Sequence, residues 1–202
     1  MTALLSTTYF GPVQWYQKLH RFGQVQIEAH EHFQKQTYRN RCLIATAQGV
    51  QALTVPVSLE GGKAFISDHG NWRHLHWQAI TSAYGDSPFL EYYEDDLREF
   101  FFERRWDELF DFNWDICVKM CDLIDIHPVL LKTAEYARKA DSIDSLSIAD
   151  YREAIRPKHP VADSDFVPRP YYQVFSQRHG FLPNLSVLDL LLNMGPEAVF
   201  YL

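Results

Sequence analysis

The first thirty residues change their hydrophobic spacing twice. Residues 4–9 read as a short strand, and glycine followed by proline then signals a turn in which the proline is placed to open a helix. Apolar residues recur at near-helical spacing from Val13 to Phe22, and residues 24–29 alternate as a second strand. This order predicts a βαβ unit, whose ligand-binding edge lies at the carboxyl ends of its strands.

The next stretch has the shorter spacing of strands. Residues 42–46 and 50–57 flank a Gln-Gly pair, which is compatible with a hairpin or with a helix-to-strand join. We favour a third strand at 52–57, followed by a fourth at 64–68 after a glycine-containing loop.

Helical periodicity dominates from residue 71 onward. Amphipathic helices are predicted at 71–84, with Asn71 as the cap, from Pro88 to about residue 103, and along a face from 106 to 124. Together they predict a helical insertion over 71–126.

The last third of the chain is less regular. Residues 138–165 read as a loop-rich connection with a strand near Leu146, and residues 171–175 as a helix. Residues 187–193 are nearly all apolar and predict a buried C-terminal helix closed by a Gly-Pro pair.

These elements predict a single α/β, Rossmann-like domain spanning residues 1–202. It has a short, mainly parallel sheet, the helical insertion and a C-terminal helix that completes the core. A chain of 202 residues with 47% hydrophobic residues can bury such a core. Aromatic residues reach 15%, which indicates wide use of rings in packing and favours a ring-lined cleft.

The formal net charge of -7 argues against binding to nucleic acid or to an anionic membrane, because both need a broad positive field. A small anion in a pocket remains compatible with it. The start of the chain lacks the basic and apolar regions of a secretory signal, and no apolar run is long enough to cross a bilayer. We therefore expect a cytoplasmic protein without a membrane span.

Residues 34–41, here called the polar octet, concentrate hydrogen-bond donors. Their sequence, Gln-Lys-Gln-Thr-Tyr-Arg-Asn-Arg, contains amide, hydroxyl, phenol and guanidinium groups but no aliphatic side chain. Lys35, Arg39 and Arg41 predict a site for phosphate or carboxylate, since a guanidinium fork fits either group. The alternative is an exposed turn with solvated charges.

Four further polar residues belong to this hypothesis. Asn40 and Tyr38 would supply directed hydrogen bonds, and we assign Tyr38 to the catalytic group. Gln14 and Lys18, on the first helix, would join the substrate-binding set if they face the same sheet edge. For Lys18 the alternative is an exposed position on an amphipathic helix.

Histidines supply the candidate for proton movement. His76 is predicted as a general base, the alternative being a packed core histidine. His30 and His32, with Glu28 or Glu31, have the chemistry to hold a metal, but no third and fourth ligands follow at diagnostic spacing. The sequence therefore predicts no metal site, and it does not identify a cofactor.

Two residues near the C-terminus are predicted to support the site from behind. Asp189 stands in an apolar helix, so it must find a hydrogen-bond partner or hold a proton. We expect it to orient Arg39 or Arg41. Asn184 is predicted to cap the C-terminal helix.

Several motifs together resemble the WbqC-like proteins, and they span nearly the whole chain. They are Tyr9-Phe10-Gly11-Pro12 with Tyr16 to Leu19, Gln36-Thr37-Tyr38-Arg39-Asn40-Arg41, Leu53-Thr54-Val55-Pro56-Val57, Leu75-His76-Trp77 with Ile80 and Tyr84, Pro88-Phe89 with Tyr92-Tyr93, and Tyr172-Gln173-Val174-Phe175 through Asn184-Leu185-Ser186-Val187-Leu188-Asp189-Leu190-Leu191. The resemblance implies a transferase of surface-polysaccharide (O-antigen) biosynthesis, which transfers a small acyl or aminoacyl group such as glycine to a sugar. It supplies no accepted catalytic residues.

Two alternatives stand beside this function. The opening strand, turn and helix are similar to nucleotidyltransferases and class I aminoacyl-tRNA synthetases, but their His-x-Gly-His motif is replaced here by Gln14-Trp15-Tyr16. A nucleotide-dependent enzyme would use the same cations for its phosphates. A noncatalytic interaction protein would instead use its aromatic residues as an interface. For the enzymes, the expected partner is a small anionic or nucleotide-linked substrate.

Overall fold

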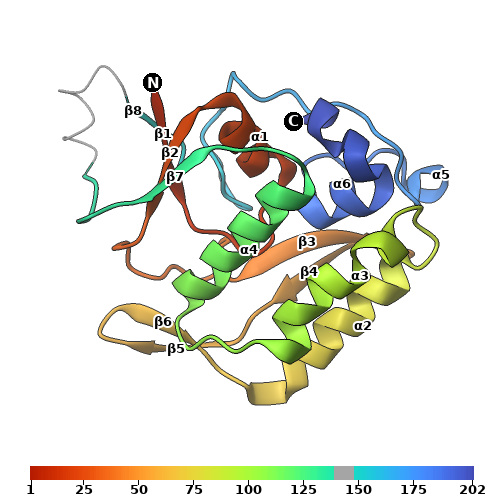
Figure 1. The fold of residues 1–202 in the computed structure, drawn as a ribbon, viewed down its shortest axis with the longest axis horizontal. Coiled ribbons are helices and arrows are strands. Elements are labelled where there is room, and N and C mark those ends of the chain that lie inside the picture. The colour runs from red at the N-terminus through yellow and green to blue at the C-terminus, as the bar shows by residue number, and fades with distance from the viewer. Residues whose placement is uncertain (139–147) are drawn as a thin grey trace.

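The computed structural model describes residues 1–138 and 148–202. It contains a four-stranded sheet formed by β1 (Thr2–Ser6), β2 (Gln24–Glu28), β7 (Val129–Lys132) and β8 (Ile148–Asp150). Its order is β7-β2-β1-β8, and every pair is parallel (Figure 1). The mixed α/β class and the parallel sheet are therefore as predicted.

The βαβ opening is also confirmed. Helix α1 (Val13–Arg21) connects β1 to β2, and its last turn holds Lys18, His20 and Arg21. The central β1 is apolar on both faces, as expected of a parallel strand that is covered on each side.

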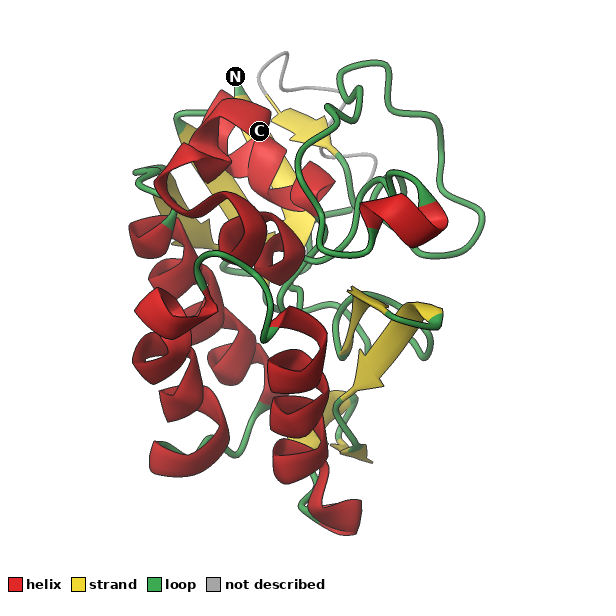
Figure 2. Cartoon of the chain, turned by 90° about the vertical axis from the view of Figure 1, so that its right-hand side faces the viewer, coloured by secondary structure: helices red, strands yellow, loops and turns green. Residues whose placement is uncertain are grey.

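Two antiparallel hairpins follow instead of further strands of this sheet. They are β3 (Arg41–Thr46) with β4 (Gly49–Thr54), and β5 (Val57–Glu60) with β6 (Lys63–Ile66). The single strand predicted at 52–57 is therefore wrong, because Pro56 offers no backbone N–H and the chain changes partner there. Figure 2 shows the antiparallel strands apart from the parallel sheet.

Between β6 and β7 the chain forms α2 (Trp72–Tyr84), α3 (Leu90–Arg98), a π-helical turn (Glu99–Glu103) and α4 (Leu109–Leu123). The predicted helices are thus present. The predicted Asn71 cap is wrong: this residue has a left-handed φ of 50°, and its side chain makes no capping hydrogen bond. Among the described residues, none of the helices has the length and apolar character that a bilayer crossing requires.

The end of the chain corrects two expectations. Residues 171–175 are not helical, and the short α5 (Ser176–His179) begins after them. The strand expected near Leu146 falls outside the described residues, whereas β8 starts at Ile148. The predicted C-terminal helix is present as α6 (Val187–Met194) and leads into a 3-10 helix at Gly195–Tyr201.

Backbone hydrogen bonds tie α6 to the start of α1. The Val13 N–H donates to the Leu185 carbonyl at 2.9 Å, and the Val187 N–H donates to the Gly11 carbonyl at 2.8 Å. Gly11 is required here because a Cβ atom would lie 2.3 Å from Thr8 Oγ1. The start of α6 is therefore fixed against the loop that joins β1 to α1.

Candidate functional site

The carboxyl edge of the parallel sheet carries a cluster of polar residues. Ser6 ends β1 and lies in register with Glu28, which ends β2. On the flanks, Lys132 ends β7 and Asp150 ends β8. Parallel sheets bind ligands at this edge, so the cluster lies where the fold favours a site.

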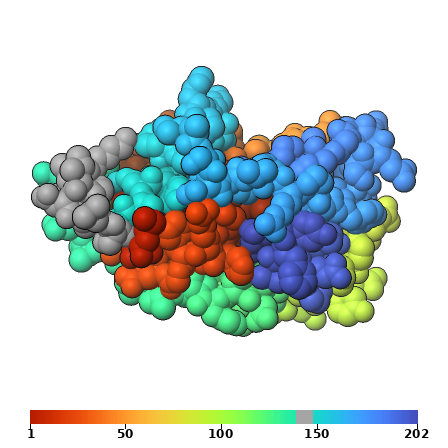
Figure 3. All heavy atoms as spheres, turned by 90° about the horizontal axis from the view of Figure 1, so that it is seen from above, coloured from red at the N-terminus to blue at the C-terminus, as the bar shows by residue number. Residues whose placement is uncertain are grey.

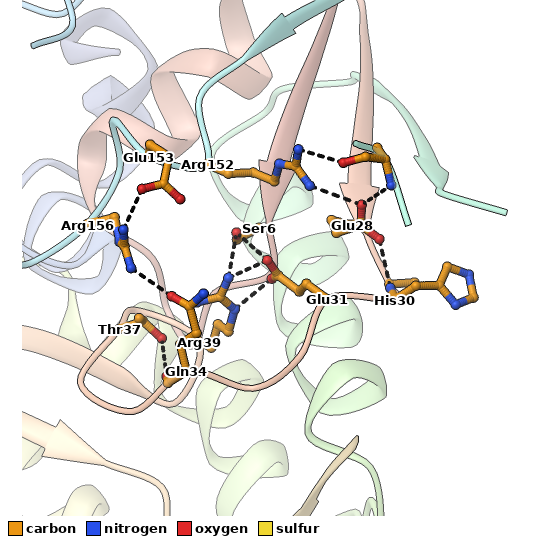
Figure 4. A network of polar contacts seen from close by, with 12 residues as sticks. Ser6, Glu28, His30, Glu31, Gln34, Thr37, Arg39, Arg152, Glu153 and Arg156 are labelled. Atoms are coloured by element: carbon orange, nitrogen blue, oxygen red, sulfur yellow. Dashed lines mark hydrogen bonds and ion pairs between the residues drawn. The ribbon is translucent and has the colours of Figure 1, made fainter. Parts of the chain in front are cut away.

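Arg39 reaches this edge from the polar octet. Its Nε donates to Glu31 Oε1 at 2.7 Å, and its Nη2 binds Glu31 Oε2 in the second half of a fork. The same Nη2 donates to Ser6 Oγ at 3.1 Å, and Ser6 Oγ donates to Glu31 Oε2 at 2.9 Å. The three side chains form one fixed unit (Figure 4).

Glu28 organises the neighbouring half of the cluster. Its side chain is fully buried and accepts hydrogen bonds from the His30 N–H and from Thr133 Oγ1, both at 2.8 Å. Its other oxygen accepts from the Ala137 N–H at 2.9 Å and from Arg152 at 3.3 Å. The carboxylate is therefore saturated and joins the loops after β2, β7 and β8.

The octet does not act as a single group. Lys35 is exposed, Arg41 donates to Thr54 Oγ1 at 3.2 Å on the outer hairpin, and Asn40 donates to the Val55 carbonyl at 2.8 Å. Tyr38 is buried, and its backbone carbonyl accepts from the Tyr9 N–H. Of the three predicted cations, Arg39 is the one that the structure brings to the sheet edge.

Two hollows of about 300 Å³ each meet at the pair of Arg39 and Glu31, which lines both. The first, here called the ring-walled hollow, has Phe33 and Phe110 in its wall. Its remaining lining residues are Thr7, Glu28, Ala29, His30, Gly62, Lys63, Ala64, Glu108, Leu109, Lys132 and Thr133.

The second, here called the polar hollow, is bordered by side chains that hydrogen-bond. Besides the shared pair, its lining residues are His32, Gln34, Tyr136, Asp150, Arg152 and Glu153. The ion pair thus forms a common wall, with an aromatic surface on one side and a hydrogen-bonding surface on the other.

Between β1 and the segment after β8 lies a third space of about 10 Å³, the size of one water molecule. Its polar lining residues carry hydroxyl and guanidinium groups, and they include Tyr38. The lining residues are Leu5, Ser6, Thr7, Thr8, Trp15, Thr37, Tyr38, Arg39, Tyr151, Arg152, Ile155 and Arg156.

His76, the predicted base, lies elsewhere, in α2. It is only 6% exposed, its Nδ1 lies 2.9 Å from the Tyr9 hydroxyl, and its ring packs edge-on against Trp72. Burial lowers the pKa of His76 to about 4, and a hydrogen bond with the Thr54 backbone opposes this shift. It lines none of the three spaces around Arg39.

Lys18 and Gln14 face the segment after β8 rather than the octet. Lys18 Nζ lies 2.7 Å from Asp163 Oδ2 and 4.4 Å from the ring centre of Tyr151. Gln14 donates to the same carboxylate at 2.8 Å. Figure 3 shows this segment, coloured cyan to light blue, packed against the N-terminal residues in red and orange.

The two predicted supporting residues serve other elements. Asn184 accepts from the Gln14 N–H at 2.9 Å, so it caps α1, while Ser186 caps α6. Asp189 is fully buried and accepts hydrogen bonds from three neutral donors, so it orients neither arginine of the octet. These donors are Tyr84 at 2.9 Å, Tyr171 at 2.7 Å and Gln173 at 2.7 Å.

Burial raises the pKa of Asp189, and its three donors oppose the shift. Within residues 1–138 and 148–202, no group of three or more histidine, cysteine or acidic side chains is arranged to hold a metal ion.

In a comparison with known protein families, residues 7–201 of the chain match one family. The chain belongs to the WbqC-like protein family. Among curated proteins it is similar to the uncharacterized protein Rv1507c of Mycobacterium tuberculosis, at 26% identity over 195 residues. The match covers 84% of this chain and 83% of that protein. No solved structure matches this WbqC-like chain.

The sequence-based reasoning missed several members of the cluster. Glu28 stands near the carboxyl end of a predicted strand, but the sequence suggested it, like Glu31, only as a possible metal ligand. Ser6 falls in the middle of the strand predicted at 4–9, whereas β1 ends at this residue. Arg152 gave no signal, since it follows a strand of three residues that carries no clear alternation.

Proposed function

We propose that this WbqC-like protein transfers a small acyl or aminoacyl group to a sugar at the carboxyl edge of its parallel sheet. The observation that carries the proposal is the position of Arg39 and Glu31 as the common wall of two hollows. Group transfer needs two substrates in contact, and two hollows that share a charged wall provide adjacent sites for them.

The ring-walled hollow and the polar hollow differ in the chemistry of their lining residues, and each suits one of the two substrates. Sugars present hydroxyl groups, which suit the carboxylates, guanidinium and phenol of the polar hollow. An activated acyl donor has an apolar portion, which suits the rings of Phe33 and Phe110. The family resemblance adds the expectation of glycine as the transferred group and surface polysaccharide as the destination. The location that we propose is the cytoplasm.

Charge on the reacting carbonyl oxygen would be stabilised by Arg39. Glu31 and Ser6 hold its guanidinium in place, so no reorganisation is needed when charge develops. This role replaces the predicted joint action of Lys35, Arg39 and Arg41.

The test is an acyl-transfer assay with mass spectrometric detection. Wild-type protein is incubated with glycyl or short acyl thioesters and a panel of amino sugars and sugar nucleotides. We expect one acceptor to gain the mass of the acyl group, and Arg39→Lys, which keeps the charge but loses the fork, to lower turnover roughly 10²-fold. Arg21→Lys, at an exposed position of α1, is the matched control. Equal turnover of wild type and Arg39→Lys would contradict the proposal.

A nucleotide-dependent enzyme is the second candidate. It is favoured by the strand order, because successive connections change direction between β1 and β8, and parallel sheets bind nucleotides at the carboxyl ends of the strands beside such a point. Thermal shift with ATP and magnesium, compared with sugar nucleotides, separates the two functions. A ligand that binds only the folded protein raises the melting temperature.

A further inference from the structure

His30 and His76 use their ring nitrogens differently. His76 is buried, with Nδ1 bonded to the Tyr9 hydroxyl and a second hydrogen bond to the Thr54 backbone. The side chain of His30 is exposed, and its Nε2 lies 3.0 Å from the Thr133 carbonyl. A carbonyl oxygen only accepts, so Nε2 carries the hydrogen, and in the neutral ring Nδ1 keeps a lone pair.

The lone pair on His30 Nδ1 is available to a ligand. Within residues 1–138 and 148–202, no hydrogen-bond partner occupies this nitrogen. His30 lines the ring-walled hollow beside Glu31, and Figure 4 shows its ring directed away from Glu28 and Glu31. His30 is held at two points: its backbone N–H donates to the Glu28 carboxylate, and its ring Nε2 donates to the Thr133 carbonyl.

The carboxylates beside it are already engaged. Glu31 accepts from both ends of the Arg39 fork and from Ser6, and Glu28 accepts four hydrogen bonds. Neither is free to accept a proton from a substrate without breaking the unit that holds the sheet edge together.

We propose that His30 is the catalytic base of the transfer reaction, in place of His76. This inference rests on the proposed function. His30 Nδ1 accepts the proton of the acceptor amine or hydroxyl where the acceptor extends from the polar hollow past Arg39 and Glu31 into the ring-walled hollow and attacks the donor carbonyl.

The new acyl bond forms and the bond to the leaving group breaks. The proton then passes from His30 to that leaving group, a thiolate if the donor is a thioester. Atoms and charge balance with no further reactant.

The decisive variant is His30→Gln. Glutamine can place an N–H near the position of Nε2 and so keep the hydrogen bond to the Thr133 carbonyl, but it has no basic nitrogen. We expect kcat to fall roughly 10²-fold or more, with KM for the donor unchanged. His20→Gln, on the exposed last turn of α1, is the matched control and should retain wild-type kcat.

A second variant separates chemistry from folding. His30→Ala should lose turnover and regain part of it when imidazole is added, because free imidazole can replace the missing base. If wild type transfers acyl groups and His30→Gln does so equally well, His30 is not the base, although the proposed function stands. If imidazole restores nothing to a folded, donor-binding His30→Ala, the assignment is also overturned. If wild type transfers no acyl group to any acceptor, both proposals fall.

Discussion

Arg39 and Lys18 are both buried cations paired with one acidic side chain, yet their surroundings differ. The side chain of Arg39 is 10% exposed and borders two hollows at the carboxyl edge of the sheet. The side chain of Lys18 is fully buried under Tyr151 and the segment that carries Asp163. A buried ion pair therefore does not mark a site by itself. Its position beside open volume at the strand ends is what distinguishes Arg39.

The largest effect on stability is expected for Arg39→Met. This change leaves the Glu31 carboxylate buried and without its guanidinium, which costs about 3–5 kcal/mol. Urea unfolding followed by circular dichroism measures the loss. A loss below about 1 kcal/mol would mean that the pair is solvated and that its position in the wall of both hollows is accidental.

Lys18→Met should have a smaller effect on stability and none on turnover per folded molecule. Asp163 would lose its ammonium partner but keep the hydrogen bonds from Gln14 and the Asp165 N–H, so we expect a loss of about 1–3 kcal/mol. The same urea experiment and the acyl-transfer assay give the two readouts. A selective loss of turnover in folded Lys18→Met would place Lys18 in the site and remove the contrast with Arg39.

The contribution of Asp163 should depend on pH. Burial raises its pKa, but hydrogen bonds from Lys18, Gln14 and the Asp165 N–H outweigh this, so the pKa lies below the ordinary 3.8. The folded-state pKa is the lower one, so this stabilisation is present above pH 3.8 and is lost as pH falls through the folded pKa. The stability difference between wild type and Lys18→Met should therefore shrink under acid. If the stability difference between wild type and Lys18→Met stays constant down to pH 2, ionisation of Asp163 is not its cause.

The smallest effect is expected at the edge of the ring-walled hollow. Lys63 pairs with Glu108 at 2.9 Å, but its side chain is 63% exposed. Lys63→Ala should change the free energy of unfolding by less than about 1 kcal/mol. A larger loss would show that the β5–β6 hairpin is held by this pair, and that exposed and buried pairs in this protein differ less than proposed.

Local sequence patterns predicted part of this architecture well. The βαβ opening and α6 were predictable because apolar spacing and turn residues agree at both places. The same unit predicted that the octet, which follows the second strand closely, would approach the sheet edge, and Arg39 does so. The pattern could not show which donors turn inward, since Lys35, Arg39 and Arg41 look alike in sequence. Within residues 1–138 and 148–202, Arg39 is the one of the three that pairs with a buried carboxylate.

The rest of the site depends on contacts between distant segments. Strands β7 and β8 have four and three residues, too few for alternation to be recognised. Arg152 meets Glu28 across 124 positions of sequence. His76 and Asp189 looked like site residues because buried polar groups need partners, and the structure supplies those partners within the core.

The most direct test of the central claim compares two substitutions of a buried carboxylate by its amide, Glu31→Gln and Asp163→Asn, in the acyl-transfer assay. Each carboxylate pairs with one buried cation, so the chemical change is matched. If the shared wall of the two hollows is the site, Glu31→Gln loses turnover roughly 10²-fold while folded Asp163→Asn retains it. Equal turnover in the two variants, or a loss confined to Asp163→Asn, would contradict that claim.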